Sequence, residues 1–339
     1  MVTAEKSGQK RKGRGQAIPP QGEGGYDQCW YVVARSSEVQ PGEVIRRDFL
    51  DGHVSVWRGT SGRVVVTGPY CRHLGADLCV RGEVIGDELR CPFHHWKFAQ
   101  DGQLTEVPSF IEELPSDGTL PTDADLFVYP TVEKLGLVWA FNGEEPLYET
   151  PAWPVDESEL SLQICAETFE MGLDPALQFT NSFDYQHLKP IHGITVERLP
   201  EVEFRQYGVK STGVQLKDSN RLDGANLSVV NEIFGTSALS VYGNAAGADV
   251  YTMLGMTPMP GGVAHGWLVT GGPKGTDEAT LEMLEGWVRA LVIDDDQDVM
   301  GAISFRLDNL AKVDFKPLGR FLKYAMDYPR AHPGQDFIS

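Results

Sequence analysis

Short apolar runs alternate with turn residues over positions 26–150, and this pattern predicts an all-β region. The runs are rich in Val, Tyr and Trp, as at 53–57, 63–67 and 137–141. The segment 58–63 joins the first two runs and reads Arg-Gly-Thr-Ser-Gly-Arg, which is typical of a hairpin loop. We therefore expect antiparallel strands joined by tight turns in this part of the chain.

The second half of the chain mixes helical and strand periods. Asp174 and Pro175 predict the start of a helix that runs to about His187, and Pro190 is expected to stop it. Residues 200–272 have the pattern of strands separated by Gly, Asn and Pro turns. A helix thus precedes a long antiparallel sheet in the expected order of elements.

A helical period returns between Thr276 and about Leu310, with Thr276 as the expected N-cap. One side of this segment is apolar, through Leu281, Leu284, Trp287, Val288 and Leu291. A helix, then strands, then a second helix predict an α+β fold in which helices cover one face of an antiparallel sheet.

A Pro-rich and acidic stretch at 144–154 predicts a domain boundary. The expected parts are a tail at 1–25, an all-β domain at 26–150 and an α+β domain at 151–339. The tail is rich in Gly, almost free of apolar residues and basic between Lys6 and Arg14. A disordered extension is the expected form of this tail, and a nucleic-acid-binding arm is the alternative.

Charge and composition limit the classes of function. The 339 residues carry a formal net charge of −19, and a surface this acidic repels nucleic acid and anionic membranes. No apolar run of about 18 residues predicts a membrane span, and the N-terminus lacks the apolar core of a secretory signal. The five cysteines are too few and odd in number for a disulfide scaffold. We expect a cytoplasmic protein.

Two segments each offer one Cys and one His. Cys71-Arg-His73 is followed, after seventeen residues, by Cys91-Pro-Phe-His94. Zinc is one reading of two Cys and two His, but its usual sites cluster a CxxC pair and a separate pair of His. The alternating order suits a Rieske [2Fe–2S] cluster, in which one iron takes both thiolates and the other takes both imidazoles. We therefore expect two loops that hold such a cluster between them.

Neighbouring residues refine this first motif. His95 could replace His94 as a ligand, but the CxxH spacing favours His94, and a packed loop residue is the expected role of His95. Ala76 and Phe93 occupy the positions at which high-potential Rieske proteins join the two loops by a disulfide, and Cys79 has no obvious partner in the other loop. Fewer constraints on the cluster favour the low end of the Rieske potential range.

A second constellation lies in the predicted helix. Asn181, Asp184 and His187 recur every three residues and would share one face of that helix, while Pro190 would let His192 turn back beside His187. Two neutral imidazoles this close together are good ligands for Fe(II). A pair of ordinary histidines at a helix end is the alternative reading.

An iron site with two His needs a carboxylate, and the late helix offers the acidic cluster 294–298. A calcium-binding EF-hand loop that started at Asp294 would need Gly and Glu where the chain has Val299 and Phe305, so calcium is disfavoured. A solvated acidic turn is the other alternative. Beside two histidines and the first motif, a metal ligand is the better interpretation of this cluster.

In their order and spacing, the two motifs resemble those of the Rieske non-haem iron oxygenase α subunit, the ring-hydroxylating oxygenase family. The resemblance runs from Tyr26 onward. It implies an all-β Rieske domain followed by a catalytic domain with a helix-grip-like fold, an antiparallel sheet with flanking helices. It assigns the cluster to Cys71, His73, Cys91 and His94, and a mononuclear Fe(II) to His187, His192 and a carboxylate.

The resemblance also bears on the acidic cluster and on assembly. In the family the carboxylate ligand precedes an apolar pair by three and four residues, which selects Asp296 and leaves Asp295 and Asp298 open. Asp184 matches an aspartate that links a cluster ligand of one subunit, here His94, to an iron ligand of the next, here His187. Asn181 matches a residue near the iron. A bridge between subunits implies a homotrimer.

The implied activity is O₂-dependent oxidation of a small aromatic or heteroaromatic substrate, with O₂ as the cosubstrate. No flavin or nicotinamide motif is visible, so a separate ferredoxin or reductase would deliver electrons from NAD(P)H. The cluster loops look most like those of family members that oxidise an arylamine nitrogen to a nitro group. Ring hydroxylation or O- or N-demethylation is the alternative reaction, and a Rieske electron carrier or a zinc module is the rival class.

Aromatic and Met residues of the second half are candidates for a substrate pocket, although core positions are the more common role for such residues. The candidates are Phe183, Tyr185, Met253, Met256 and Trp267.

Overall fold

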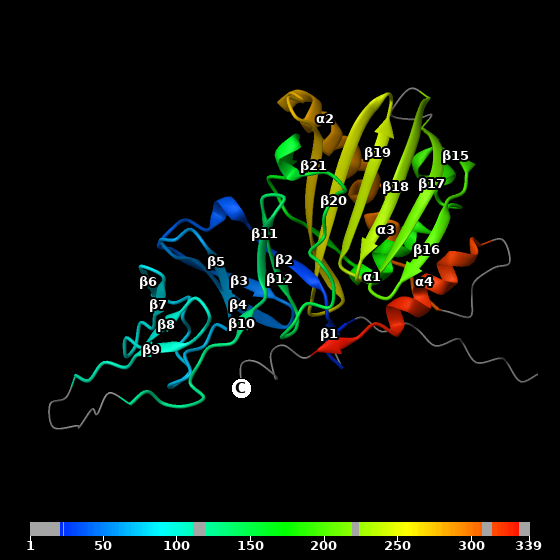
Figure 1. The fold of residues 1–339 in the computed structure, drawn as a ribbon. Helices are drawn as coiled ribbons and strands as arrows, with labels where there is room; N and C mark the ends of the chain where they lie inside the picture. The colour runs from blue at the N-terminus through cyan, green and yellow to red at the C-terminus, as the bar shows by residue number, and fades with distance from the viewer. Residues whose placement is uncertain (1–20, 23, 111–118, 219–223, 307–313, 332–339) are drawn as a thin grey trace, which may run out of the picture.

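The computed structural model describes residues 21–22, 24–110, 119–218, 224–306 and 314–331. Three small antiparallel sheets form one side of the molecule, and one large antiparallel sheet with helices forms the other (Figure 1). The predicted α+β class is confirmed. The tail at 1–20 lies outside the described residues, so its expected disorder stays a prediction.

The small sheets come from the first part of the chain, where β-strands alternate with tight turns. Their hydrogen-bonded orders are β10-β5-β4-β3, β11-β12-β2 and β6-β7-β8-β9. The strands are β2 (Trp30–Arg35), β3 (Val44–Phe49), β4 (Gly52–Arg58), β5 (Val64–Thr67), β6 (Glu83–Ile85), β7 (Glu88–Arg90), β8 (Lys97–Ala99), β9 (Leu104–Glu106), β10 (Val128–Tyr129), β11 (Thr131–Lys134) and β12 (Leu137–Phe141). The three strands predicted at 53–57, 63–67 and 137–141 correspond to β4, β5 and β12, and a hairpin joins β4 to β5 as expected.

The large sheet follows the order β13-β21-β20-β19-β18-β17-β15, with β14 paired to β21 and β16 paired to β17. Its strands are β13 (Leu160–Ile164), β14 (Phe169–Met171), β15 (Ile194–Arg198), β16 (Glu201–Arg205), β17 (Gly208–Asp218), β18 (Ala225–Phe234), β19 (Ala238–Ala245), β20 (Ala248–Met259) and β21 (Val263–Pro273). The strands expected at 200–272 are confirmed. A short pair, β1 (Tyr26–Asp27) and β22 (Arg330–Ala331), brings the two described ends of the chain together.

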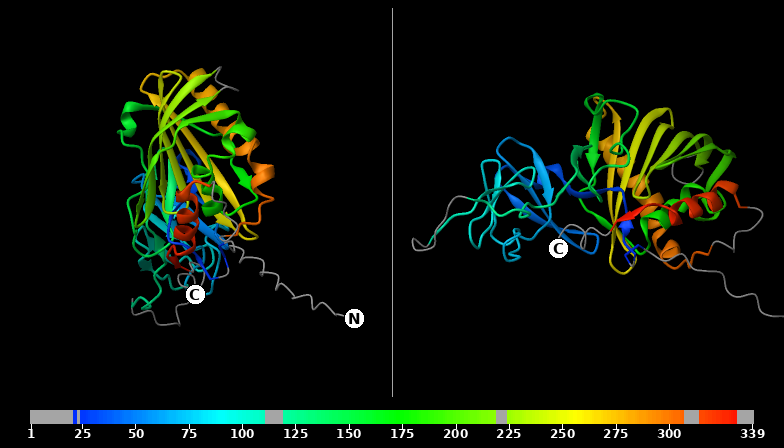
Figure 2. Two further views of the ribbon diagram at one scale, coloured as in Figure 1. Left: turned by 90° about the vertical axis from the view of Figure 1, so that its right-hand side faces the viewer. Right: turned by 60° about the horizontal axis from the view of Figure 1, so that its bottom comes forward.

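Four α-helices accompany the sheet in the described part of the chain: α1 (Pro175–Gln178), α2 (Glu278–Arg289), α3 (Gln297–Met300) and α4 (Lys316–Met326). The helical segment that contains α2 lies against one face of the sheet (Figure 2). No helix among the described residues is long and apolar enough to cross a membrane.

The single helix expected from Asp174 to His187 is wrong. The Asp174 side chain caps α1 as predicted, but α1 ends at Gln178 and tightens into a 3₁₀ turn, Phe179–Ser182. Polar side chains compete for the backbone here: the Thr180 hydroxyl donates to Leu177 O at 2.6 Å, and the Asp184 carboxylate accepts from Gln186 N at 3.1 Å. Such local bonds replace helical ones.

Pro190 does not stop a helix either. It lies inside a π-helical turn, Leu188–His192, in which its missing N–H leaves no bond unmade. The turn ends instead at Gly193, whose φ of +72° is the left-handed conformation that glycine adopts most readily.

The cap of the late helix lies one residue after the predicted one, and the helix is not continuous. Asp277, not Thr276, caps α2, because its carboxylate accepts from Thr280 N at 3.0 Å while the Thr276 hydroxyl donates to Pro273 O. A π-helical turn, Ala290–Asp294, then separates α2 from α3. Helix α4 was not predicted from the sequence, although its buried residues recur at helical spacing: Leu318, Phe321, Leu322 and Ala325.

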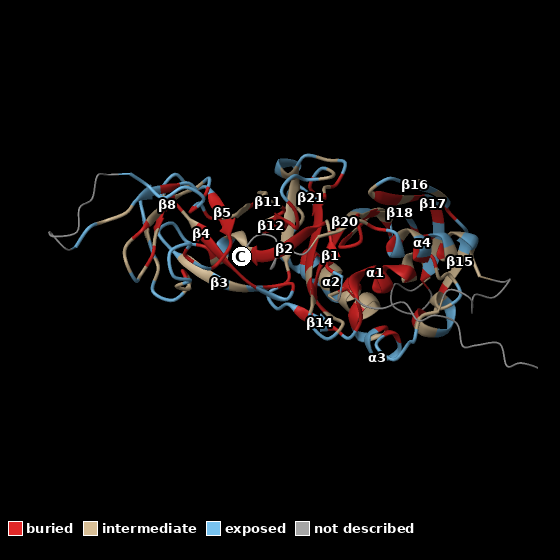
Figure 3. Cartoon of the chain, turned by 90° about the horizontal axis from the view of Figure 1, so that it is seen from below, coloured by how far each residue is buried: buried red, intermediate tan, exposed pale blue. Residues whose placement is uncertain are grey.

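The two halves of the molecule share a hydrophobic core. Trp30, Val32 and Trp139 from the small sheets pack in one cluster with Met253 and Val269 from the large sheet. Buried residues run through β2 in Figure 3. The contact is close, because a Cβ atom added at Gly255 would lie 2.7 Å from Val32 Cγ2. The boundary predicted near residue 150 therefore lies between elements that pack together, and it stays a prediction.

Candidate functional site

Two loops of the same backbone design carry the Cys and His residues of the first motif. In one, Cys71 N donates to Ala76 O and Gly75 N donates to Cys71 O. In the other, Cys91 N donates to Trp96 O and His95 N donates to Cys91 O. The fourth residue after each Cys has a positive φ, +74° at Gly75 and +57° at His95. His95 is thus a structural loop residue, and its ring packs edge-on against Phe110 at 5.7 Å.

The four side chains of this motif converge, with the thiols inside and the imidazoles outside. Cys71 and Cys91 are buried, whereas His73 is exposed and His94 is half-buried. The Nδ1 atoms of the two imidazoles lie 3.2 Å apart. The His73 ring also stacks on Trp96 at 4.6 Å between ring centres, which fixes its orientation.

The donors fit a two-iron cluster better than a single zinc ion. Among the described residues, these four are absent from the groups of three or more donors whose ligand atoms all lie within 4.8 Å of one another. A zinc ion holds its ligands at about 2.0–2.3 Å and so needs such a compact group. A hydrogen bond from the Cys71 thiol lowers the pKa of Cys91, but two adjacent thiolates would repel without a cation between them.

Cys79, the unassigned thiol of the first loop, lies outside this pair. Its sulfur is 3.1 Å from the Ser55 hydroxyl, and its backbone N–H donates to the Asp77 carboxylate. Burial, aided by the nearby Asp77, raises the pKa of Cys79 to about 11. The same Asp77 accepts from the His53 ring at 3.0 Å, so this group ties the cluster loop to β4.

The second constellation also comes together. The ligand atoms of His187, His192 and Asp296 lie within 4.8 Å of one another, and the two imidazole ring centres are 5.2 Å apart. His192 and Asp296 are buried. Each half of the site borders a π-helical turn, and such turns interrupt helices frequently at functional sites.

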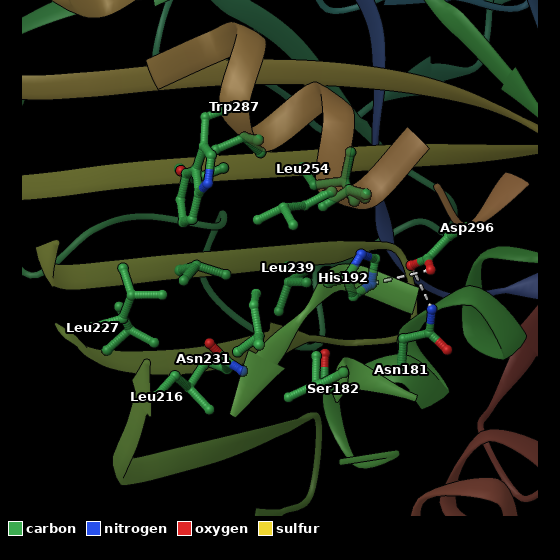
Figure 4. Close-up of a pocket in the computed structure, with 18 of the residues that line it drawn as sticks. Asn181, Ser182, His192, Leu216, Leu227, Asn231, Leu239, Leu254, Trp287 and Asp296 are labelled. Atoms are coloured by element: carbon green, nitrogen blue, oxygen red, sulfur yellow. Dashed lines mark hydrogen bonds and ion pairs between the residues drawn. The ribbon is translucent and has the colours of Figure 1, made fainter. Parts of the chain in front are cut away.

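The geometry separates the roles of the acidic residues. His192 Nε2 faces Asp296 Oδ1 at 3.2 Å, and His192 Nδ1 faces Asp295 Oδ2 at 3.0 Å. Asp295 thus holds the tautomer that leaves Nε2 beside Asp296. Asn181 Nδ2 donates to Asp296 Oδ2 at 2.7 Å and orients that carboxylate (Figure 4). Asp298 is exposed and lies outside the group of donors formed by His187, His192 and Asp296.

This constellation favours a positive charge at its centre. Burial opposes protonation of His192, yet the Asp296 and Asp295 carboxylates raise the pKa of this imidazole above its ordinary value. Two carboxylates that favour an imidazolium in this way also favour a metal cation in its place. The donor set of two His and one carboxylate therefore fits a mononuclear iron.

Asp184 lies beside His187, the remaining residue of the donor set. Its Oδ2 is 3.7 Å from His187 Nδ1, a buried ring nitrogen with no hydrogen-bond partner. The His187 imidazole lowers the pKa of Asp184 below its ordinary value, so this carboxylate is ionised. About a third of the Asp184 side chain is exposed, at 36%. One carboxylate thus reaches both His187 and the protein surface.

A cavity of about 200 Å³ opens beside His187, His192 and Asp296. Apolar side chains of the large sheet form one wall, and Trp287 of α2 with neighbouring residues forms the other (Figure 4). The five aromatic and Met residues suggested from the sequence do not line this cavity. Phe183, Met253 and Met256 are core residues, whereas Tyr185 and Trp267 border other surface hollows.

Sequence comparison identifies the first domain. The Rieske [2Fe–2S] domain family matches residues 29–119. Aminopyrrolnitrin oxygenase PrnD of Pseudomonas fluorescens is 33% identical over 175 residues, which are 49% of this chain and 46% of that protein. A cholesterol 7-desaturase of Xenopus laevis is 35% identical over 130 residues, which are 37% of this chain and 27% of that protein. The chain spans about half the length of these relatives or less.

Solved structures extend the likeness to most of the chain. Dicamba monooxygenase bound to dicamba has a TM-score of 0.65 at 18% identity and covers 89% of this chain and 97% of its own. NdmA of Pseudomonas putida CBB5 has a TM-score of 0.65 at 18% identity, with 87% and 88% covered. These structures share the fold. The chain thus contains a Rieske [2Fe–2S] domain at residues 29–119, and its fold is similar to that of these solved structures.

Proposed function

We propose that this chain is the oxygenase component of a Rieske non-haem iron monooxygenase. The observation that carries the proposal is the meeting of His187, His192 and Asp296 at one end of an apolar cavity, in a chain with a Rieske domain. The family implies a Rieske cluster, a mononuclear iron and O₂ as cosubstrate. Bound there, the iron would supply O₂ activation and the cluster would supply electrons.

In this proposal the chain holds its metals through the two constellations. Cys71, Cys91, His73 and His94 bind the cluster. His187 and His192 bind the iron through imidazole nitrogens, and Asp296 binds it through a carboxylate. Asp295 and Asn181 are positioning residues: the first fixes the His192 ring, and the second fixes the Asp296 carboxylate.

Electron transfer is proposed to cross between subunits of a homotrimer. Asp184, at 3.7 Å from His187, would reach His94 of a neighbouring copy. The cluster loops support a second copy at this place, because Leu74 and Phe93, neighbours of the two cluster histidines, are 67% and 62% exposed. Exposed apolar side chains of this kind mark interaction sites. A separate ferredoxin or reductase would reduce the cluster. We place the protein in the cytoplasm, because its cysteines are free and free cysteines are typical of a reducing compartment.

The proposed substrate is a small aromatic or heteroaromatic molecule, and N-oxygenation of an arylamine to a nitro compound is the leading reaction. The likeness to PrnD, which carries the name aminopyrrolnitrin oxygenase, supports it. Ring hydroxylation and O- or N-demethylation are the alternatives.

When an aniline is offered to the reduced enzyme under O₂, we expect a hydroxylamino or nitro product, detected by mass spectrometry. A phenol or formaldehyde would assign the reaction to the alternatives.

Metal analysis of anaerobically purified protein tests the proposal most directly. We expect about three iron and two acid-labile sulfide per chain, from one cluster and one mononuclear iron. His187→Ala should keep the sulfide and lose about one iron. If the protein holds two iron and two sulfide, and reconstitution with Fe(II) adds no third iron, the chain is an electron carrier. If it holds zinc and no sulfide, the chain is a zinc module.

Asp295→Asn tests the positioning role of that carboxylate. The amide can present its N–H to His192 Nδ1 and so favour the wrong tautomer, and the variant should bind Fe(II) roughly 10–100-fold more weakly, with the cluster unchanged. Iron affinity is measured by titration of the iron-depleted protein. Asp298→Asn removes an exposed charge from the same segment and should bind Fe(II) as the wild type does. Equal affinity in the two variants would contradict the role.

Asp184→Asn tests the bridge. Both metal sites should stay filled, because neither loses a ligand, while the reduced cluster should be reoxidised roughly tenfold more slowly in a single turnover. Stopped-flow absorbance of the cluster measures this rate. Glu197→Gln, at an exposed carboxylate on β15, is the matched control. A wild-type rate in Asp184→Asn with full metal content would remove Asp184 from the electron path.

A further inference from the structure

The cavity beside the proposed iron site has a mostly apolar sheet wall, in which Asn231 and Thr252 are the polar residues. Alternate residues of a strand face the same side of a sheet, so Leu227, Val229 and Asn231 of β18 all line the cavity. Most other residues of the sheet that line the cavity are apolar: Leu216, Leu239, Val241, Val250, Leu254 and Leu268. Figure 4 shows Asn231 between Leu227 and His192.

The Asn231 carboxamide oxygen takes no part in holding the fold together. This atom, Oδ1, is buried and has no hydrogen-bond partner. A second carboxamide, that of Gln178 at the end of α1, lines the same cavity, is only 3% exposed and also has an unpartnered Oε1. Buried polar atoms are nearly always paired in folded proteins, so unpaired ones in a cavity wall point to a ligand that supplies the missing bond.

Charge limits what that ligand can be. Among the described residues, no Lys or Arg lines the cavity, and its one carboxylate is Asp296. A carboxylate or sulfonate buried here would lose its hydration without gaining a cationic partner from these walls. The walls therefore suit a neutral molecule.

The cavity also limits size. Its volume is about 200 Å³. For comparison, an engineered apolar protein cavity of about 150 Å³ holds one benzene molecule. One or two fused rings match the available space, and a four-ring skeleton exceeds it.

We propose that the cavity selects a neutral molecule of one or two aromatic rings with a single hydrogen-bonding substituent, and that Asn231 is the residue that recognises this substituent. The inference rests on the proposed function, since it takes the cavity as the substrate site. The Asn231 carboxamide can accept a hydrogen bond from an O–H or N–H group through Oδ1, while Val229 and Leu227, which precede it on the same face of β18, contact the ring. The substituent bound at Asn231 fixes which edge of the ring faces His187 and His192.

Three probes of matched size test the proposal by equilibrium binding without turnover. Naphthalene, 2-naphthol and 2-naphthoate are titrated calorimetrically into the full-length, iron-loaded protein under anaerobic conditions without reductant. We expect 2-naphthol to bind about tenfold more tightly than naphthalene, because it supplies the bond that Asn231 lacks, and 2-naphthoate to bind most weakly. In Asn231→Leu, which has a similar volume, 2-naphthol and naphthalene should bind equally well.

Asn226→Leu is the matched control, since Asn226 lies on the same strand but is exposed and does not line the cavity. It should keep the wild-type order of the probes. Circular dichroism checks that both variants fold, and Asn231→Ala replaces Asn231→Leu if the larger side chain does not fit. Equal wild-type affinity for 2-naphthol and naphthalene, tight binding of 2-naphthoate, or binding of none of the three overturns the inference. The iron and sulfide content is measured on the same samples, so failure of the proposed function is seen separately.

Discussion

The arrangement around His192 is the constraint on which the second half of the molecule depends. One imidazole ring contacts two successive carboxylates, Asp295 through Nδ1 and Asp296 through Nε2. Neighbouring residues on a regular α-helix point about 100° apart, and here the helix is interrupted between α2 and α3. A second interruption, the π-helical turn that contains Pro190, delivers His192 to the same place. The two π-helical turns thus bring His192 and Asp295, which are 103 residues apart in the chain, into contact.

Irregular backbone of this kind needs a rigid frame. The large antiparallel sheet provides it on one side, and α4 covers α1 and the adjoining 3₁₀ turn on the other. Phe321 of α4 packs on Phe183 at 4.8 Å between ring centres, and Phe183 directly precedes Asp184 in the chain. The short polar segment that carries Asn181, Asp184 and His187 is therefore fixed by its aromatic neighbours, since its own helical hydrogen bonds are few.

The cluster loops are supported by the small sheets, and these sheets pack against the large one. Both loops leave short strands and close on their own backbone hydrogen bonds, so the four ligands converge by local geometry. The shared core of Trp30, Val32, Trp139 and Met253 then couples the small sheets to the large one. This core leaves His73 and the neighbouring Leu74 exposed, away from the large sheet of their own chain.

The sequence by itself determined the local features. Ligand type and spacing indicated the Cys71–His94 loops, because each loop is closed by bonds between residues at most five apart. Alternation of apolar residues predicted the strands, since period-two patterning reflects burial of one sheet face. Asp296 was also predicted as the carboxylate ligand within its acidic cluster, but only through the resemblance to a known family.

Tertiary structure alone decided the remainder. The helix expected up to His187 is interrupted because side-chain hydrogen bonds and aromatic packing outweigh helix propensity there. The separate roles of Asp295 and Asp296 arise from contacts with His192, which is more than 100 residues away in the chain. The position of the unpaired Asn231 Oδ1 in a mostly apolar wall likewise depends on how the sheet packs. Such contacts depend on how distant segments pack, and local patterning carries no record of them.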